Sequence, residues 1–439
     1  MSFSPENTRT KFSIQPLSCL SQECETINPI LKNCGGCDVH KSVVISCILT
    51  GDFDNPPEKE VRDFGTMTKG IVEMAEWFIE KKVFDVAMES TGIYWKPIYN
   101  ILESKGINVV LVNARHIKNL PGRKTDIKDA QWIAELFRNG LVSASFIPPK
   151  GIRELRDLTR TRRKLVEDKT RVKNRIEKVL QDSNIKLSSV VSNVFGVSGR
   201  ALISCLPDQT QLAADEISSL VKGQLKKKVH QIEDALEGNL AETNKYLLSQ
   251  HMKHLDFLEL SINDLDIKIE EKMVEFQTES DLIQTVPGIS SVAASSIIAE
   301  IGTDMSRYPN EHHLSSWAGM CPGNNESAGK KKSGRIRKGN NHLKGILTEC
   351  AWAASKTKDT EMSAYYHRLA RKKGKKRALI ALGHKMLNEI YRVLKSGTFY
   401  EEKGQDILAQ GKILREEFLI KQLETMGYSV QKLEIASYA

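Results

Sequence analysis

Four acidic residues in the first third of the chain have the types and positions of metal ligands. Asp38 lies in GGCDVHK, Glu89 in MESTG, and Asp126 and Asp129 in KTDIKDA. Residues three apart on a helix share one side, so the last two carboxylates would point the same way. Oxygen ligands suit Mg²⁺ or Mn²⁺, and two such ions ~4 Å apart stabilise the attacking and leaving oxygens of a phosphodiester. The set therefore indicates metal-dependent chemistry on a nucleic-acid backbone.

The surrounding sequence predicts an α/β layer that brings these acids together. Apolar, β-branched runs alternate with amphipathic segments, which is typical of a sheet covered by helices. The predicted elements are strands over 43–49, 83–88 and 108–112 and helices over 70–82 and 96–105. Asp38 falls in or just before the first strand of this unit, and Glu89 at the carboxyl end of a later one. Open α/β sheets place their sites outside the carboxyl ends of strands, where the helix-borne Asp126 and Asp129 can join them.

Each acid also has an ordinary structural interpretation. Asp126 could be a helix N-cap, and Glu89 could be a surface residue at a strand end. Taken together, a strand Asp, a strand-end Glu and a helical Asp-x-x-Asp resemble the ribonuclease-H-like nucleases, specifically the RuvC-type subgroup.

From residue 152 onward the β signal disappears and heptad spacing begins. Eleven Lys or Arg residues between 153 and 178 predict a long, basic amphipathic helix, and a second apolar series follows after a turnaround at 206–223. The two series are Leu158, Leu165, Val172 and Val179, then Leu248, Leu255, Ile262, Ile269 and Phe276. Either an antiparallel helical hairpin or a seam with another copy would bury these stripes. We expect an α/β unit followed by an all-α region.

The carboxyl-terminal part combines a Pro-Gly turn with two basic runs. The turn at 285–290 precedes a helix at 291–301, which predicts either a helix-hairpin-helix facing a DNA phosphate or a plain helical corner. Residues 327–348 hold seven Lys or Arg and no acid, and 368–377 hold seven more. The net charge of +9 is modest, but such dense runs attract phosphate backbones.

The motifs, in this order, resemble the IS110-family transposases over roughly 35–395. The acidic boxes are the three segments quoted above, and the later matching segments are VPGI, AEIG, WAG and the SAGK box that leads to GNN. The resemblance implies that Asp38, Glu89, Asp126 and Asp129 hold Mg²⁺, with Mn²⁺ as the alternative, in a RuvC-like domain. It also implies a serine nucleophile at Ser327, a transient phosphoserine link to DNA and a structured guide RNA. The two sites would come together between protomers of a tetramer.

Ser327 suits this role because the flanking lysines can neutralise a phosphate under attack. The alternative is a polar residue in a flexible basic loop, and Ser333 is a less favoured nucleophile. Three departures from the family pattern are Ala328, Ser290 and Cys37. The predicted nucleic-acid contacts are Lys330, Lys331, Lys332, Arg335, Arg337 and Lys338 in this loop and Arg160, Arg163 and Arg171 on the basic helix.

The remaining predictions concern the cysteines, the domain boundaries, the oligomeric state and the competing functions. Cys19, Cys24, Cys34 and Cys37 have a spacing that permits zinc, but we expect reduced thiols instead. The expected location is the cytoplasm of a prokaryote, with the protein associated with the nucleoid when it acts. The predicted divisions are an extension at 1–33, the RuvC-like domain at 34–150, a coiled-coil region at 151–281, the transposase domain at 282–396 and a helical tail at 397–439. A homo-oligomer, a dimer or tetramer, is expected. Competing functions are a hydrolytic junction nuclease and a non-catalytic nucleic-acid scaffold.

Overall fold

The computed structural model divides by its contacts into two compact units, Met1–Ile147 and Pro148–Ala439. The structure describes residues 30–89, 92–112, 126–142, 145–209, 212–322, 325–327, 330–333, 336, 338–402 and 404–430. Among the described helices, none combines the length and apolarity that a bilayer crossing requires.

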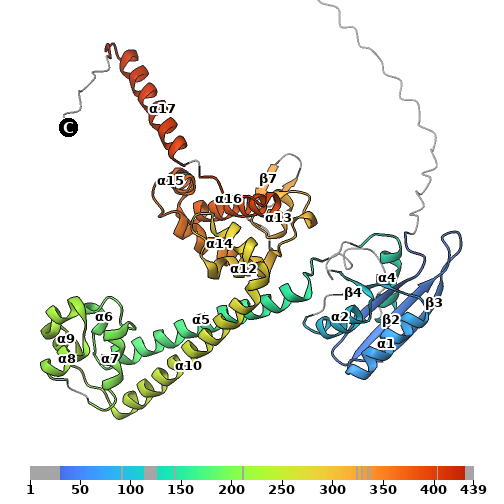
Figure 1. Ribbon diagram of the computed structural model, residues 1–439, viewed down its shortest axis with the longest axis horizontal. Coiled ribbons are helices and arrows are strands. Elements are labelled where there is room, and N and C mark those ends of the chain that lie inside the picture. Colours follow the sequence, from blue (N-terminus) through green and yellow to red (C-terminus); the bar gives the residue numbers. More distant parts are fainter. Residues whose placement is uncertain are drawn as a thin grey trace, which may run out of the picture. The chain divides into compact units, whose positions relative to one another are not determined.

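The first unit is built on a mixed five-stranded sheet (Figure 1). Its strands are β1 (Cys34–Val39), β2 (Val43–Thr50), β3 (Glu58–Gly65), β4 (Asp85–Glu89) and β5 (Asn108–Val112). The order is β3-β2-β1-β4-β5, antiparallel from β3 to β1 and parallel from β1 to β5. The predicted α/β layer is therefore confirmed.

Helices cover both faces of this sheet. On one face, α1 (Thr68–Glu80) and α2 (Trp95–Ser104) bury Phe78 and Leu102 in a core with Cys37 and Met88. On the other face, α4 (Asp126–Arg138) buries Ala134 in a smaller cluster with strands β1 and β2. Alternate side chains of a strand point to opposite faces of the sheet. Along β1, they therefore face α1 and α2 on one side and α4 on the other.

Three strands depart from the prediction, and the first is β1, which holds Asp38 and is separate from the predicted run at 43–49. Strand β5 occupies 108–112 as expected, whereas β4 begins two residues later than the predicted run. Strand β3 is missing from the prediction because its sequence, EKEVRDFG, is mostly charged and exposed. Charge of this kind is typical of an edge strand, where it discourages pairing with another sheet.

The second unit begins with two long helices, α5 (Lys150–Asp182) and α10 (Glu242–Met273), that lie side by side and antiparallel (Figure 1). Lys272 Nζ lies 2.6 Å from Glu154 Oε2 near one end, and Asn244 Nδ2 donates to Ser183 Oγ at 3.0 Å near the other. The described heptad residues Leu248, Leu255, Ile262 and Ile269 are buried. Of the two predicted arrangements, the antiparallel hairpin within one chain is confirmed.

Between these long helices, the chain forms a small helical cluster instead of a simple turnaround. Its members are α6 (Leu187–Val190), α7 (Val197–Cys205), α8 (Ala214–Leu220), η1 (Gly223–Lys228) and α9 (Val229–Leu236). Their apolar residues share one core with Ile176 of α5 and Leu255 of α10. Helices of 4 to 9 residues hold too few turns for a sequence period to reveal them.

In the carboxyl-terminal part, α16 (Lys375–Ser396) packs against α11 (Gln277–Gln284), α13 (Glu311–Trp317), α14 (Asn341–Ala354) and α15 (Glu361–Lys373). Helix α12 (Ser291–Ile301) packs against α5 and α14, and α17 (Gly404–Thr425) packs against α15. The short turns are η2 (Val274–Phe276) and η3 (Met305–Arg307). A hairpin of β6 (Asn325–Ser327) and β7 (Lys330–Ser333) interrupts them. The first turns of α5 join this core through Ile152 and Leu155.

Candidate catalytic and nucleic-acid sites

Asp38 and Glu89 end neighbouring parallel strands on the same face of the sheet. The last paired residues of β1 and β4 are Cys37 and Met88, and the two acids come next on each strand. Asp38 shares its face with Gly36, and Glu89 shares its face with Ala87, two residues earlier in each strand. Ala87 belongs to the cluster that α4 covers, so both acids lie on the α4 side.

The direction of α4 places its first turn near these acids. Arg138, its last residue, donates to the carbonyl of Lys32, just before β1 begins, at 2.7 Å. The helix therefore runs opposite to β1, and its amino-terminal end lies toward the carboxyl end of that strand. That end carries Asp126 and Asp129.

Gly36 allows α4 to cross β1 this closely. A Cβ atom at Gly36 would lie 2.4 Å from both the carbonyl oxygen of Ala130 and the amide nitrogen of Ala134. Since such contacts are shorter than any real Cβ contact, only glycine permits the helix backbone to rest on the strand at this position. The GGCD motif thus provides both an acid and the close packing that brings α4 to it.

Asp38 and Glu89 lie at one end of one sheet face, and Asp129 lies in the first turn of the helix that covers this face. The side chain of Asp126 is outside the part of the chain that the structure describes. Within the described residues, no three His, Cys, Asp or Glu side chains converge on a metal position. Asp38 is 6% exposed, and His40 Nε2, a buried atom without a hydrogen bond, lies 3.1 Å from Asp38 Oδ2. Carboxylate oxygens gathered at a strand end match the ligand chemistry of Mg²⁺.

Of the four early cysteines, the two that the structure describes, Cys34 and Cys37, do not share a site. Cys34 lies on the α4 face, where its thiol donates to the Ala134 carbonyl, and Cys37 lies on the α1 face beside Ser46 Oγ. Burial raises the pKa of both thiols to about 12. The two sulfurs on opposite faces cannot bind one ion together, and Cys19 and Cys24 lie outside the described residues.

In the second unit, Ser327 is the last residue of β6, paired in register with Lys330 at the turn end of the hairpin. A bridge between Pro322 and Ile336 closes the base of this hairpin. The side chains of Ser327, Lys330, Lys331, Lys332, Arg335 and Arg337 lie outside the described residues. Lys338 is described and exposed.

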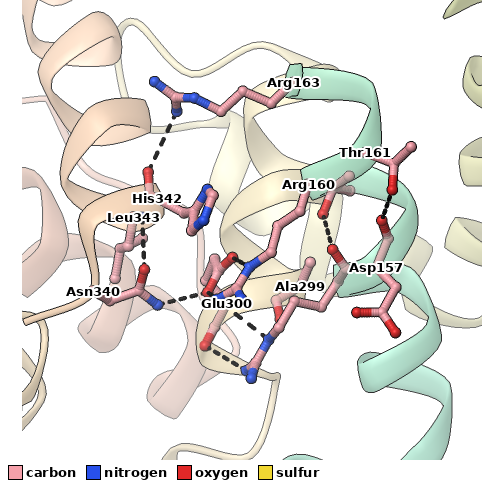
Figure 2. Close-up of polar contacts among 11 residues, drawn as sticks. Asp157, Arg160, Thr161, Arg163, Ala299, Glu300, Asn340, His342 and Leu343 are labelled. Carbon is pink, nitrogen blue, oxygen red and sulfur yellow. Dashed lines mark hydrogen bonds and ion pairs between the residues drawn. The ribbon is translucent and has the colours of Figure 1, made fainter. Parts of the chain in front are cut away.

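The three arginines predicted on α5 all contact acids, and Figure 2 shows Arg160 with its partner Glu300. Arg160 donates from Nε and Nη2 to the two carboxylate oxygens of Glu300, at 2.7 and 2.8 Å. Arg163 Nη2 lies 3.2 Å from Glu349 Oε1, and Arg171 pairs with Asp168. Their charges are therefore partly neutralised within the protein, a feature that residue counting along the sequence misses.

The Pro-Gly turn packs against the protein core at its glycine. Gly288 has φ +89°, and a Cβ there would lie 2.6 Å from the Cys350 carbonyl on α14. Ser290 caps α12 by accepting from the Ala293 amide. A cavity of about 400 Å³ lies between this turn, α5 and α14. His342 lines it, and burial together with nearby Arg160 lowers the pKa of that imidazole, which is therefore neutral at pH 7.

The junction of α15 and α16 is a basic surface that the predicted contact residues omitted. Its seven cations are all exposed, and none forms an ion pair with a described residue: Arg368, Arg371, Lys372, Lys373, Lys375, Lys376 and Arg377. We call this set the α15–α16 basic surface. Beside it, a hollow of about 510 Å³ is lined by Lys358 and His367 as well as by three of the seven. The dense run of Lys and Arg at 368–377 was the sequence signal from which this surface could have been predicted.

Comparison with known proteins identifies the class as transposases of insertion sequences. The family model for the DEDD transposases of IS110 matches residues 35–185, and that of the IS116/IS110/IS902 transposases matches 280–367. The two matches fall on the acidic sheet unit and on the region of the Ser327 hairpin. The chain belongs to the IS110 family of transposases.

Individual relatives support this assignment. The transposase for insertion sequence element IS1111A of Coxiella burnetii is 23% identical over 322 residues, which cover 71% of this chain and 78% of that protein. An uncharacterized 43.6 kDa protein of insertion element IS110 of Streptomyces coelicolor is 28% identical over 133 residues, covering 30% and 32%. The chain therefore matches about a third of that relative's length.

Proposed function

We propose that the chain is a DNA transposase that cuts and rejoins strands with Ser327 as nucleophile and the four acids as metal ligands. The observation that carries this proposal is that Asp38 and Glu89 lie at the same end of one sheet face, toward which the acidic amino-terminal end of α4 is directed, in the unit matched by the DEDD model. The mixed sheet, with Asp38 on its central strand, also supports a RuvC-type fold for this unit.

In this proposal the protein's own groups handle charge and protons around the reacting phosphate. Asp38, Glu89, Asp126 and Asp129 would hold Mg²⁺, which when bound would supply positive charge to the phosphodiester and lower the cost of ionising a hydroxyl. The Ser327 oxygen loses its proton and forms a bond to phosphorus. The bond from phosphorus to the strand oxygen breaks, and that oxygen takes up a proton. Rejoining reverses these steps with the hydroxyl of another strand.

The basic residues of the second unit would hold the backbone. We assign most of the charge contacts to the α15–α16 basic surface and to Lys330, Lys331, Lys332, Arg335, Arg337 and Lys338. Unpaired cations release counterions from a phosphate backbone, and this supplies affinity. Arg160, Arg163 and Arg171 contribute less, because acids already share their charge. We further propose a structured guide RNA and a homo-oligomer as partners.

A covalent adduct distinguishes this mechanism from simple hydrolysis. Full-length protein, Mg²⁺, DNA carrying the ends of the encoding element and RNA transcribed from its flank would be incubated and run on a denaturing gel. Wild type and Ser333→Ala should give protein-linked DNA, and Ser327→Ala and Asp126→Asn should give none. An adduct that survives Ser327→Ala would overturn the assignment of the nucleophile.

The second candidate is a hydrolytic nuclease. It is favoured by one observation, namely that the acid set belongs entirely to the first unit and does not require the hairpin. It predicts cut DNA free of protein in the same gel, with Ser327→Ala as active as wild type.

A further inference from the structure

Glu300 is a buried carboxylate that gathers three segments of the second unit (Figure 2). It lies in the last turn of α12 and is 1% exposed. Arg160 of α5 binds both its oxygens, and Arg156 donates to the carbonyls of Ala299 and Glu300 at 2.8 and 3.0 Å. A buried charge is tolerated only when it is paired and hydrogen-bonded, as this one is.

The third segment reaches Glu300 through Asn340. The amide Nδ2 donates to Glu300 Oε2 at 2.6 Å, and the amide Oδ1 accepts from the Leu343 backbone N–H at 3.1 Å. The second of these bonds caps α14, which begins at residue 341. Both ends of the Asn340 side chain are therefore engaged, so the residue has one orientation.

Asn340 is also where the Ser327 hairpin returns to the helical core. The hairpin closes at the bridge between Pro322 and Ile336, four residues earlier. On the way, a Cβ at Gly339 would lie 2.5 Å from both the Ala318 carbonyl and the Gly319 amide. The segment after the hairpin thus packs against the segment before it, and the hydrogen bond from Asn340 to Glu300 holds this pair of segments on α12.

Electrostatics strengthens this anchor. Burial alone would raise the pKa of Glu300, but hydrogen bonds from Arg160 and Asn340, together with the positive charges of Arg160 and Arg156, outweigh burial and hold the pKa below its ordinary 4.5. The carboxylate is therefore ionised at neutral pH. Hydrogen bonds to a charged acceptor are about twice as strong as neutral ones, so this bond holds Asn340 more firmly than an uncharged partner would.

We propose that Glu300 is a positioning residue, which acts through Asn340 to fix the Ser327 hairpin on the scaffold of α5 and α12. This inference rests on the proposed function, because positioning the hairpin affects the reaction only if Ser327 is the nucleophile. Arg156 and Arg160 serve the same end by holding Glu300. The reacting serine is then oriented by residues that never touch the DNA, and small misplacements of a reacting group are costly.

Asn340→Ser tests this proposal with little risk to folding. Serine is a good N-cap, so α14 keeps its cap while the amide donor to Glu300 is lost. Asn310→Ser is the matched control, since Asn310 caps α13 without a link to Glu300. In Asn340→Ser, we expect adduct formation at saturating DNA to slow about 10-fold to 100-fold, with DNA affinity changed less than about twofold. Asn310→Ser should match wild type.

Limited trypsin digestion provides a readout that does not depend on catalysis. Cleavage after Lys338 or the two arginines before it should be faster in Asn340→Ser than in wild type and Asn310→Ser, because the return of the hairpin is released. Unchanged cleavage would overturn the anchoring. The positioning role would be overturned by any of three results. Cleavage could be faster while the rate of adduct formation is unchanged, or the slower adduct formation could be explained by lost DNA affinity. Asn310→Ser could also show the same effect as Asn340→Ser. If wild type forms no adduct, the proposed function fails, while the digestion still decides the anchoring.

Discussion

Helix α5 and the α15–α16 basic surface are both rich in lysine and arginine, but the structure uses them differently. On α5, Arg160, Arg163 and Arg171 each face an acid, and Arg160 binds a buried one. On the α15–α16 basic surface, none of the seven cations has an ion-pair partner among the described residues. The three predicted contact arginines of α5 are therefore partly neutralised within the protein, whereas the charge on the α15–α16 basic surface remains for a polyanion.

The contrast shows that charge density along a sequence does not identify a binding surface. The partner of Arg160 lies 140 residues away along the chain, so no local pattern reveals it. The decisive property is whether a cation is already neutralised in the folded chain.

The largest expected effect is a loss of stability when Glu300, the buried partner of the α5 arginines, is neutralised. In Glu300→Gln, Arg156 and Arg160 lose their buried partner, and breaking such a pair costs about 3 kcal/mol or more. The free energy of unfolding should fall by about that amount in urea titration. Glu349→Gln is the control, because Glu349 is exposed and its loss should cost about 0.5 kcal/mol or less. Equal losses in both variants would contradict the contrast.

The next effect concerns DNA affinity. The triple variant Arg371→Gln, Lys372→Gln and Lys373→Gln should bind DNA about 100-fold more weakly at physiological salt. The slope of log affinity against log salt should become shallower by about 2.7, or 0.9 per lost phosphate contact. Fluorescence anisotropy across a salt series measures both. An unchanged slope would show that this surface does not contact phosphates.

Acidification should remove part of the α5 stabilisation. Because the pKa of Glu300 is lower in the folded protein than its ordinary 4.5, its contribution is complete above that pH. The contribution is lost as the pH falls through the folded value, where the protonated side chain behaves like glutamine. Urea titrations should show wild type approaching Glu300→Gln in stability as the pH is lowered. A constant difference at all pH values would contradict this origin.

The smallest effect is expected on α5 itself. Arg171→Gln should change DNA affinity less than about twofold and stability by about 0.5 kcal/mol or less, because Arg171 is exposed and shares its charge with Asp168. The same anisotropy assay measures the first value. If Arg171→Gln lost as much DNA affinity as the triple variant, α5 would be a main contact surface for DNA, contrary to this account.

The sequence predicted the helices and strands whose apolar period is long or regular. It identified strand β5 and the α5 and α10 pair. Strand β3, the short helices α6 to α9 and the β6–β7 hairpin were missed, since charged edges and short elements carry little periodicity.

The contacts that organise the second unit were also beyond prediction. The Glu300, Arg160 and Asn340 network joins residues far apart in the chain, and only the tertiary structure brings them together. The AEIG and GNN motifs contain two of these residues, but spacing alone does not show that they meet. Similarly, the role of Gly36 became clear only from the position of α4 above it.

The most direct measurement is to locate the amino acid that carries the DNA. The adduct formed by wild type would be digested with nuclease and protease, and the modified peptide sequenced by mass spectrometry. The account predicts a nucleotide phosphate on Ser327. A phosphate on Ser333, or cleaved DNA with no modified peptide, would contradict it.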